Sequence, residues 1–213
     1  YAAILLAGGI LTAVTGGIMA FPQRSVHRAL AYAALADMGL VLVGLGVGTE
    51  ASVRAATLHV ALRAVAIVAV AMAAGVLRRS LGGDDVEHLR GGMRRAPRSL
   101  VAMAVGGASL AGLPLTGGFA TRLVLYRALA GQNVAWAALM VLASIGPTWA
   151  FARCLLAGTV SAPTSGEQRE PLMPALLSLA LSLSLLALGA FPHLLNALPA
   201  DWLALMWPTL GVP

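Results

Sequence analysis

The sequence contains no lysine, only one cysteine and few charged residues. Charged residues make up 10% of its 213 positions, whereas a soluble domain carries about 25%. Cys154 has no second cysteine with which to form a disulfide or a cysteine metal site. All 14 basic residues are arginines, which stay protonated under nearly all conditions, so no lysine amine can hand on a proton here. These absences exclude a disulfide scaffold and argue against an ordinary soluble domain.

The sequence is instead rich in apolar residues. It is 59% hydrophobic with a mean hydropathy of +0.87, which predicts an all-α polytopic membrane protein. Hydropathy predicts six spans, at residues 2–21, 29–48, 55–77, 100–130, 134–156 and 172–191. The first span lacks a basic leader, so we interpret it as part of the fold and not as a signal peptide. Because the chain begins without methionine inside an apolar run, we also interpret it as part of a longer polypeptide.

The arginines mark one side of the predicted membrane topology. The loops after the first, third and fifth spans, with their edges, hold Arg24, Arg28, Arg78, Arg79, Arg90, Arg94, Arg95, Arg98, Arg153 and Arg169. The opposite loops hold only Arg54 and Arg127. The positive-inside rule then places the first set in the cytoplasm and both chain ends on the outer side of a bacterial-type inner membrane. This distribution predicts a lipid bilayer as surroundings and no nucleic-acid partner.

The fourth predicted span is too long for a single membrane helix. Its 31 residues as one helix reach about 46 Å, against a hydrocarbon core of about 30 Å. Pro114 lacks an N–H and displaces a carbonyl, while Gly112, Gly117 and Gly118 permit non-helical dihedrals. The sequence therefore predicts a helix broken between Gly112 and Gly118. Broken helices recur at transporter ion sites, although a kink that serves packing alone has the same signature.

Apart from Arg127 and Arg153, which are counted above with the loop edges, four charged or histidine side chains fall inside the predicted spans. They are Asp37, then His59 and Arg63 on one helix face, and Arg122 just after the break. Each costs on the order of 3 kcal/mol at the bilayer centre, so we expect them to face protein or water and to mark an ion path. Other interpretations stay open: Asp37 as a structural counter-ion of Arg63 or Arg122, His59 and Arg63 reaching to the interface, or Arg122 bonding carbonyls freed by Pro114.

Four segments in order resemble a known family. They read QRSVHRALAYAALADMGLVLVGL, HVALRAVAIVAVAMAAG, DDVEHLRGGMRRAP and GGASLAGLPLTGGFATRLVLYRAL. Together they resemble the antiporter-like membrane subunits of respiratory complex I (NADH–quinone oxidoreductase), which are shared with Mrp-type antiporters and membrane-bound hydrogenases. The matches to its two main motifs are Gln23, Arg28, Leu30, Ala31, Tyr32, Met38 and Gly39, then Gly112, Leu113, Pro114 and Phe119. The resemblance covers about residues 2–127.

The resemblance implies a fold and a set of site residues. It implies one five-helix half-channel repeat with a broken helix, at residues 1–158, a cytoplasmic loop at 159–171, and a final helix with an interfacial segment at 172–213. Only the C-terminal half of the family fold is then represented. His27 stands where the family carries lysine. Asp37 stands where the family carries glutamine or histidine, and Arg122 stands where it carries lysine or glutamate. The implied proton path is Asp37, His59 and His27, with Arg63 and Arg122 tuning it electrostatically.

Three functions stay open on this basis. The first is an ion (proton) translocating subunit of a redox-driven complex of the NADH–quinone oxidoreductase type, assembled with other membrane subunits. The second is a non-conducting scaffold of the same fold that supports a partner, for example in inorganic-carbon uptake. The third is a subunit of an Mrp-type cation/proton antiporter. The chain has no nucleophile triad, phosphate loop or metal cluster, so we expect no chemistry, cofactor or metal of its own.

Overall fold

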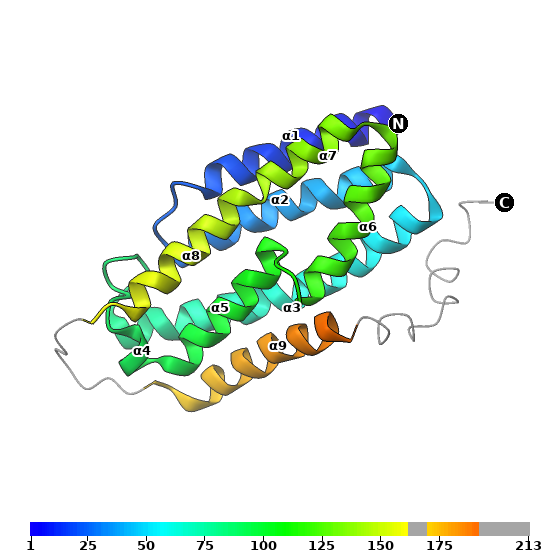
Figure 1. The fold of residues 1–213 in the computed structure, drawn as a ribbon. Coiled ribbons are helices and arrows are strands. Elements are labelled where there is room, and N and C mark those ends of the chain that lie inside the picture. The colour runs from blue at the N-terminus through cyan, green and yellow to red at the C-terminus, as the bar shows by residue number, and fades with distance from the viewer. Residues whose placement is uncertain (162–169, 192–213) are drawn as a thin grey trace.

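The computed structural model describes residues 1–161 and 170–191, which form an elongated helical bundle (Figure 1). Within these residues the helices are α1 (Ala2–Ala20), α2 (Val26–Val47), α3 (Glu50–Leu81), α4 (Gly92–Arg95), α5 (Pro97–Ala111), α6 (Gly117–Gln132), α7 (Val134–Ala143), α8 (Ile145–Thr159) and α9 (Leu172–Ala190). The described part contains no strand. Most of the predicted loop at 159–171 and the predicted interfacial segment at 192–213 lie outside the described residues.

Five parts of the described chain are long and apolar enough to cross a membrane. They are α1, α2, α3, the continuous stretch Val134–Thr159 and α9. The sixth predicted span consists of α5 and α6, which have 15 and 16 residues, and neither alone meets that length. An all-helical membrane protein is thus confirmed, with five candidate spans in place of the six that were predicted.

Helix α3 is longer than its apolar stretch predicts. It has 32 residues, about 48 Å, where the sequence predicts a span at 55–77. Its first turn is capped by the Thr49 hydroxyl, which accepts a hydrogen bond from the Ser52 N–H at 3.2 Å. It ends at Gly82, whose φ of +85° favours glycine. These caps carry the helix beyond the hydrophobic residues at both ends.

The predicted break lies between α5 and α6, but not over the whole predicted range. Gly112 has a φ of +77° and terminates α5, and the Leu113 N–H bonds the Ala108 carbonyl at 2.9 Å. Gly117 and Gly118 are helical, so their predicted non-helical dihedrals are wrong. Gly118 is needed for space, because a Cβ there would lie 2.5 Å from the Ser109 carbonyl oxygen. The chain is therefore non-helical over residues 112–116.

A second interruption, which the sequence analysis does not predict, divides the fifth span at Ser144. Helix α7 ends at Ala143 and α8 begins at Ile145. Pro147 explains this kink, since it has no N–H to donate to the Ala143 carbonyl and its ring crowds that oxygen.

Helix α1 packs with its backbone against both neighbours. A Cβ on Gly9 would lie 2.7 Å from the Gly39 oxygen of α2. On its other side, a Cβ on Gly17 or Gly146 would overlap the backbone of α7–α8 or of α1. Only residues without a side chain allow helix axes to approach this closely.

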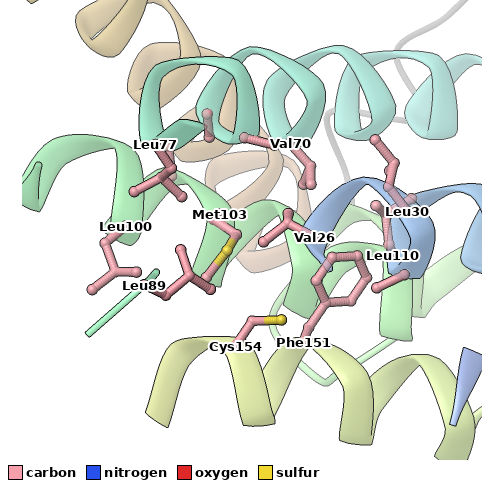
Figure 2. Packing of buried hydrophobic residues seen from close by; sticks show 14 of the residues in the cluster. Val26, Leu30, Val70, Leu77, Leu89, Leu100, Met103, Leu110, Phe151 and Cys154 are labelled. Carbon is pink, nitrogen blue, oxygen red and sulfur yellow. The ribbon is translucent and has the colours of Figure 1, made fainter. Parts of the chain in front are cut away.

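The apolar core forms two clusters with a gap between them. Figure 2 shows the larger cluster, which includes Leu77, Leu100, Met103, Phe151 and buried Cys154. On α2 this cluster ends at Ala33 and the smaller one begins at Leu40, and on α3 the corresponding residues are Ala66 and Ala56. Asp37, His59 and Arg63 fall into the gap on these two helices.

Three segments, the loops after α1 and α3 and the C-terminal end of α8, lie at the same end of the bundle (Figure 1). Two of them are bonded to each other: the Val86 N–H donates to the Arg24 carbonyl at 2.8 Å, and Ser25 and Asp85 form an isolated β-bridge. This common end agrees with the alternation of spans from which the arginine count was made.

Candidate functional site

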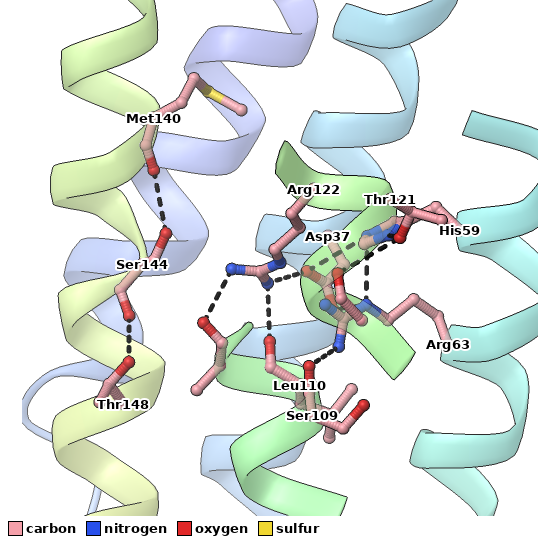
Figure 3. A network of polar contacts seen from close by, with 12 residues as sticks. Asp37, His59, Arg63, Ser109, Leu110, Thr121, Arg122, Met140, Ser144 and Thr148 are labelled. Atoms are coloured by element: carbon pink, nitrogen blue, oxygen red, sulfur yellow. Dashed lines mark hydrogen bonds and ion pairs between the residues drawn. The ribbon is translucent and has the colours of Figure 1, made fainter. Parts of the chain in front are cut away.

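Asp37 is the centre of a buried charge cluster formed with His59, Arg63 and Arg122 (Figure 3). Arg63 Nε lies 3.0 Å from Asp37 Oδ2, and Arg122 Nη2 donates to Asp37 Oδ1. His59 Nε2 lies 3.8 Å from the same Oδ1. None of the four residues is more than 4% exposed. The fold thus brings together four residues that the sequence shows on three separate segments.

Arg122 also binds the end of the broken helix. Its Nη1 donates to the Ala111 carbonyl at 2.9 Å and its Nη2 to the Leu110 carbonyl at 2.6 Å. These carbonyls have no helical partner because α5 ends there. A Cβ on Gly112 would lie 2.5 Å from Arg122 Cδ, so this glycine provides both the turn and the space. Arg122 is therefore both a counter-ion of Asp37 and a hydrogen-bond donor to carbonyls at the end of α5, so two interpretations that the sequence left open hold together.

Arg63 and His59 form the opposite part of the cluster. Arg63 Nη1 donates to the Ser109 carbonyl, and Arg63 Nε lies 3.1 Å from His59 Nε2. Because an arginine N–H can only donate, Nε2 accepts, which assigns the ring proton of a neutral His59 to Nδ1. Nδ1 then donates to the Thr121 hydroxyl at 2.8 Å. His59 and Arg63 are 0% and 2% exposed, which contradicts the interpretation that they reach to the interface.

The cluster carries excess positive charge. One carboxylate and two guanidinium groups, with neutral His59, sum to +1. Among the residues that the structure describes, none forms a hydrogen bond with Arg63 Nη2 or Arg122 Nε, and no well-aligned hydrogen bond reaches Asp37 Oδ2 despite its short distance to Arg63. The negative end of the α5 dipole, with its last carbonyls, faces both guanidiniums and offsets part of this excess. The break therefore supplies a helix C-terminus where two buried arginines need one.

His27 lies outside the cluster. It is in the first turn of α2, ten positions and about 15 Å along the helix from Asp37. Its Nδ1 lies 2.7 Å from Asp84 Oδ2, which also accepts hydrogen bonds from the His27 N–H and the Ser25 hydroxyl. Partial burial acts to raise the pKa of Asp84, but these hydrogen bonds outweigh it and hold the pKa below its ordinary value of 3.8.

Two residues next to the cluster were missed in the sequence. Tyr126 follows Arg122 by one helical turn, and its hydroxyl lies 2.9 Å from the Ser144 hydroxyl at the α7–α8 kink. Pro147 was a readable signal for that kink, but nothing in the sequence connected it with Asp37. In residues 1–161 and 170–191, no three His, Cys, Asp or Glu side chains come together as metal ligands.

The comparisons with known proteins identify the family. Residues 1–146 match the family described as NADH:quinone oxidoreductase/Mrp antiporter, TM. The chain belongs to this family. It is 34% identical over 149 residues to NADH-quinone oxidoreductase subunit N 2 of Sorangium cellulosum, covering 68% of this chain and 29% of that protein. It is 28% identical over 193 residues to subunit N of Moorella thermoacetica, covering 89% of this chain and 40% of that protein.

Solved structures give the same antiporter-like fold. The chain is similar to one in the Mrp complex from Dietzia sp. DQ12-45-1b, with a TM-score of 0.84 and 21% identity, covering 92% of this chain and 45% of that one. It is similar to a chain of respiratory complex I from Thermus thermophilus, with a TM-score of 0.81 and 23% identity, covering 92% and 42%. A chain of the archaeal membrane-bound sulfane sulfur reductase matches with a TM-score of 0.80 and 28% identity, covering 91% and 40%. This antiporter-family chain thus spans less than half the length of the relatives it matches.

Proposed function

We propose that the chain is the ion-translocating part of a membrane subunit in a redox-driven complex of the NADH–quinone oxidoreductase type, and that the ion is the proton. Its family membership supports this, and the observation that carries it is the buried Asp37–His59–Arg63–Arg122 cluster at a broken helix. Electron transfer then takes place in partner subunits. The α5–α6 pair crosses the membrane as a sixth, broken span, and the arginine-rich end of the bundle faces the cytoplasm.

His59 is the proton acceptor in this proposal. Within the described residues, its Nε2 lone pair accepts a hydrogen bond only from Arg63 Nε, which also lies 3.0 Å from Asp37 Oδ2. When Nε2 takes a proton, Arg63 turns wholly to Asp37 and the cluster charge rises from +1 to +2. The two guanidiniums repel the added charge, so the proton is passed on and not stored. Asp37 stays ionised and holds both arginines, while His27, at the cytoplasmic end of α2, takes protons up.

A second function is favoured by one specific observation. Asp37 is already paired with both arginines, and the cavity beside it has a volume of about 10 Å³, which holds about one water. Fixed bridges with little water suit a non-conducting scaffold subunit that supports a partner.

Substitution of His59 separates these two functions. Glutamine accepts from Arg63 and donates to Thr121 as the imidazole does, but it does not titrate. In inverted membrane vesicles driven by NADH and a soluble quinone, we expect His59→Gln to keep NADH oxidation but to lower the number of protons taken up per electron. Asp37→Asn should do the same where the complex assembles. His88→Gln, in the exposed loop, is the matched control.

Two results would contradict the proposal. An unchanged proton-to-electron ratio in both His59→Gln and Asp37→Asn would favour the scaffold. If NADH oxidation and proton uptake both survived deletion of the gene, the chain would not belong to such a complex.

A further inference from the structure

Helix α9 lies beside α5 and also packs against α3 and α6 (Figure 1). The proposed function uses only the C-terminal end of α5, where the carbonyls of Ser109, Leu110 and Ala111 accept hydrogen bonds from the two buried guanidiniums. It gives α9 no part. Three contacts nevertheless join α9, or the residues just before it, to α5 and to the link that follows α5.

The first contact caps the N-terminus of α5. Ala96, at the N-cap position, has no side-chain oxygen, so α5 cannot cap itself as α2 and α3 do. Glu170 supplies an oxygen from 71 positions later: its Oε1 accepts hydrogen bonds from the Ser99 N–H at 2.8 Å and from the Ser99 hydroxyl at 2.7 Å. The Glu170 side chain is only 4% exposed, and its Oε2 lies 3.4 Å from Arg98 Nη1. A buried carboxylate at this position also suits the positive end of the helix dipole.

The other two contacts lie in the middle of α9 and near its end. The buried Ser182 hydroxyl donates to the Ala102 carbonyl of α5 at 2.9 Å. Gly189, one residue before the end of α9, lies against the link, since a Cβ there would overlap the backbone of Thr116. Together with Glu170, these contacts hold α5 at its start, in its first half and at the link where it ends.

We propose that α9 is a brace that fixes the axial position of α5, and that Glu170 is a positioning residue for the charge cluster at the opposite end of that helix. The inference rests on the proposed function and adds a residue that does not touch the cluster. Carbonyls at a helix C-terminus point along its axis, so a shift of one helical rise, about 1.5 Å, would take the 2.6 and 2.9 Å bonds to Arg122 beyond hydrogen-bond distance. Those carbonyls offset the positive charge of the cluster, which rises when His59 takes a proton.

The test measures the proton-to-electron ratio of the assembled complex in NADH-driven inverted vesicles. We expect Glu170→Ala to lower the ratio at least half as far as His59→Gln does, because α5 loses its fixed position. Glu170→Gln should keep the wild-type ratio, since its amide oxygen accepts both hydrogen bonds from Ser99. Glu50→Ala is the matched control, because Glu50 also lies in a first helical turn but is exposed.

A double variant separates positioning from helix capping. In Glu170→Ala/Ser99→Asp, the new aspartate returns a carboxylate to the first turn of α5 but leaves that turn unattached to α9. We expect this variant to recover the slow thiol labelling of buried Cys154, which reports opening of the core, and yet to keep the lowered ratio. Recovery of both would make Glu170 a helix cap only and would overturn the inference.

Gly189→Ala tests the other end of the brace without changing any charge. The added methyl group displaces the link at Thr116, so we expect a lowered ratio, whereas Gly75→Ala adds its methyl group in open space and should leave the ratio unchanged. A normal ratio in Glu170→Ala and Gly189→Ala, alongside a lowered ratio in His59→Gln, would overturn the brace and leave the proposed function standing. A normal ratio in all three would overturn both.

Discussion

Replacing Asp37 by asparagine is expected to destabilise the fold strongly. The side chain keeps its size but loses the only negative charge of the cluster, whose net charge rises from +1 to +2. Arg63 and Arg122 are then buried without a counter-ion. Removing one partner of a buried ion pair costs about 3–5 kcal/mol, because the remaining charge is left uncompensated. The corresponding change Glu87→Gln should cost about 1 kcal/mol or less, because the pair of Glu87 with Arg24 is mostly exposed.

Cys154 provides the assay for this prediction. Its thiol is fully buried in the larger core cluster, so a thiol reagent reaches it only when that cluster opens. At about 1.4 kcal/mol per factor of ten, Asp37→Asn should speed labelling of the Cys154 peptide by about 10² to several times 10³. Mass spectrometry of that peptide measures the rate, with Glu87→Gln as the control.

The reasoning fails if Asp37→Asn is labelled no faster than Glu87→Gln. The double variant Asp37→Asn/Arg122→Gln gives a further check, because it returns the cluster charge to +1. It should be labelled more slowly than Asp37→Asn alone. Faster labelling would mean that the bonds from Arg122 to the end of α5 matter more than charge balance.

Two further predictions concern the helix break and the loops. Gly112→Ala should cost more than 2 kcal/mol, since the left-handed backbone alone costs a non-glycine residue about 1–2 kcal/mol and the new Cβ displaces Arg122. Gly75→Ala, which adds a Cβ in open space within α3, should instead stabilise by about 0.5–1 kcal/mol, and Cys154 labelling compares the two. The Asp84 pKa is lowered on folding, so its stabilising contribution is present above the ordinary pKa of 3.8 and is lost as pH falls through the lower folded value. Unfolding measured against pH should therefore show the advantage of the wild type over Asp84→Asn disappearing only in that acidic range, and a constant difference down to low pH would contradict this.

The sequence predicted the broken helix and the buried charges because both depend on local chemistry. Proline and glycine in an overlong apolar run indicate an interruption wherever they occur. An aspartate among apolar residues indicates a polar interior, since lipid does not tolerate it. Hydropathy alone therefore sufficed for the order of the spans and for Asp37, Arg63 and Arg122 as candidates.

Pairings between helices could not be predicted in the same way. The bonds from Arg122 to the carbonyls of α5 depend on where Gly112 turns the chain. Gly118 lies within a helix, and a glycine is needed there because of close packing and not because of its dihedral freedom. His27 was expected at the mouth of a path, yet its bond to Asp84 depends on a loop 57 positions later. Ser144 was hidden because a single serine in an apolar span has no signature of its own.

The close approach of α1 to α2 and to the α7–α8 kink limits how this half can move. Where backbones touch through Gly9, Gly39, Gly17 and Gly146, no side chains are available to change rotamer and accommodate sliding. Backbone contact therefore holds α1, α2 and the α7–α8 kink together as one block.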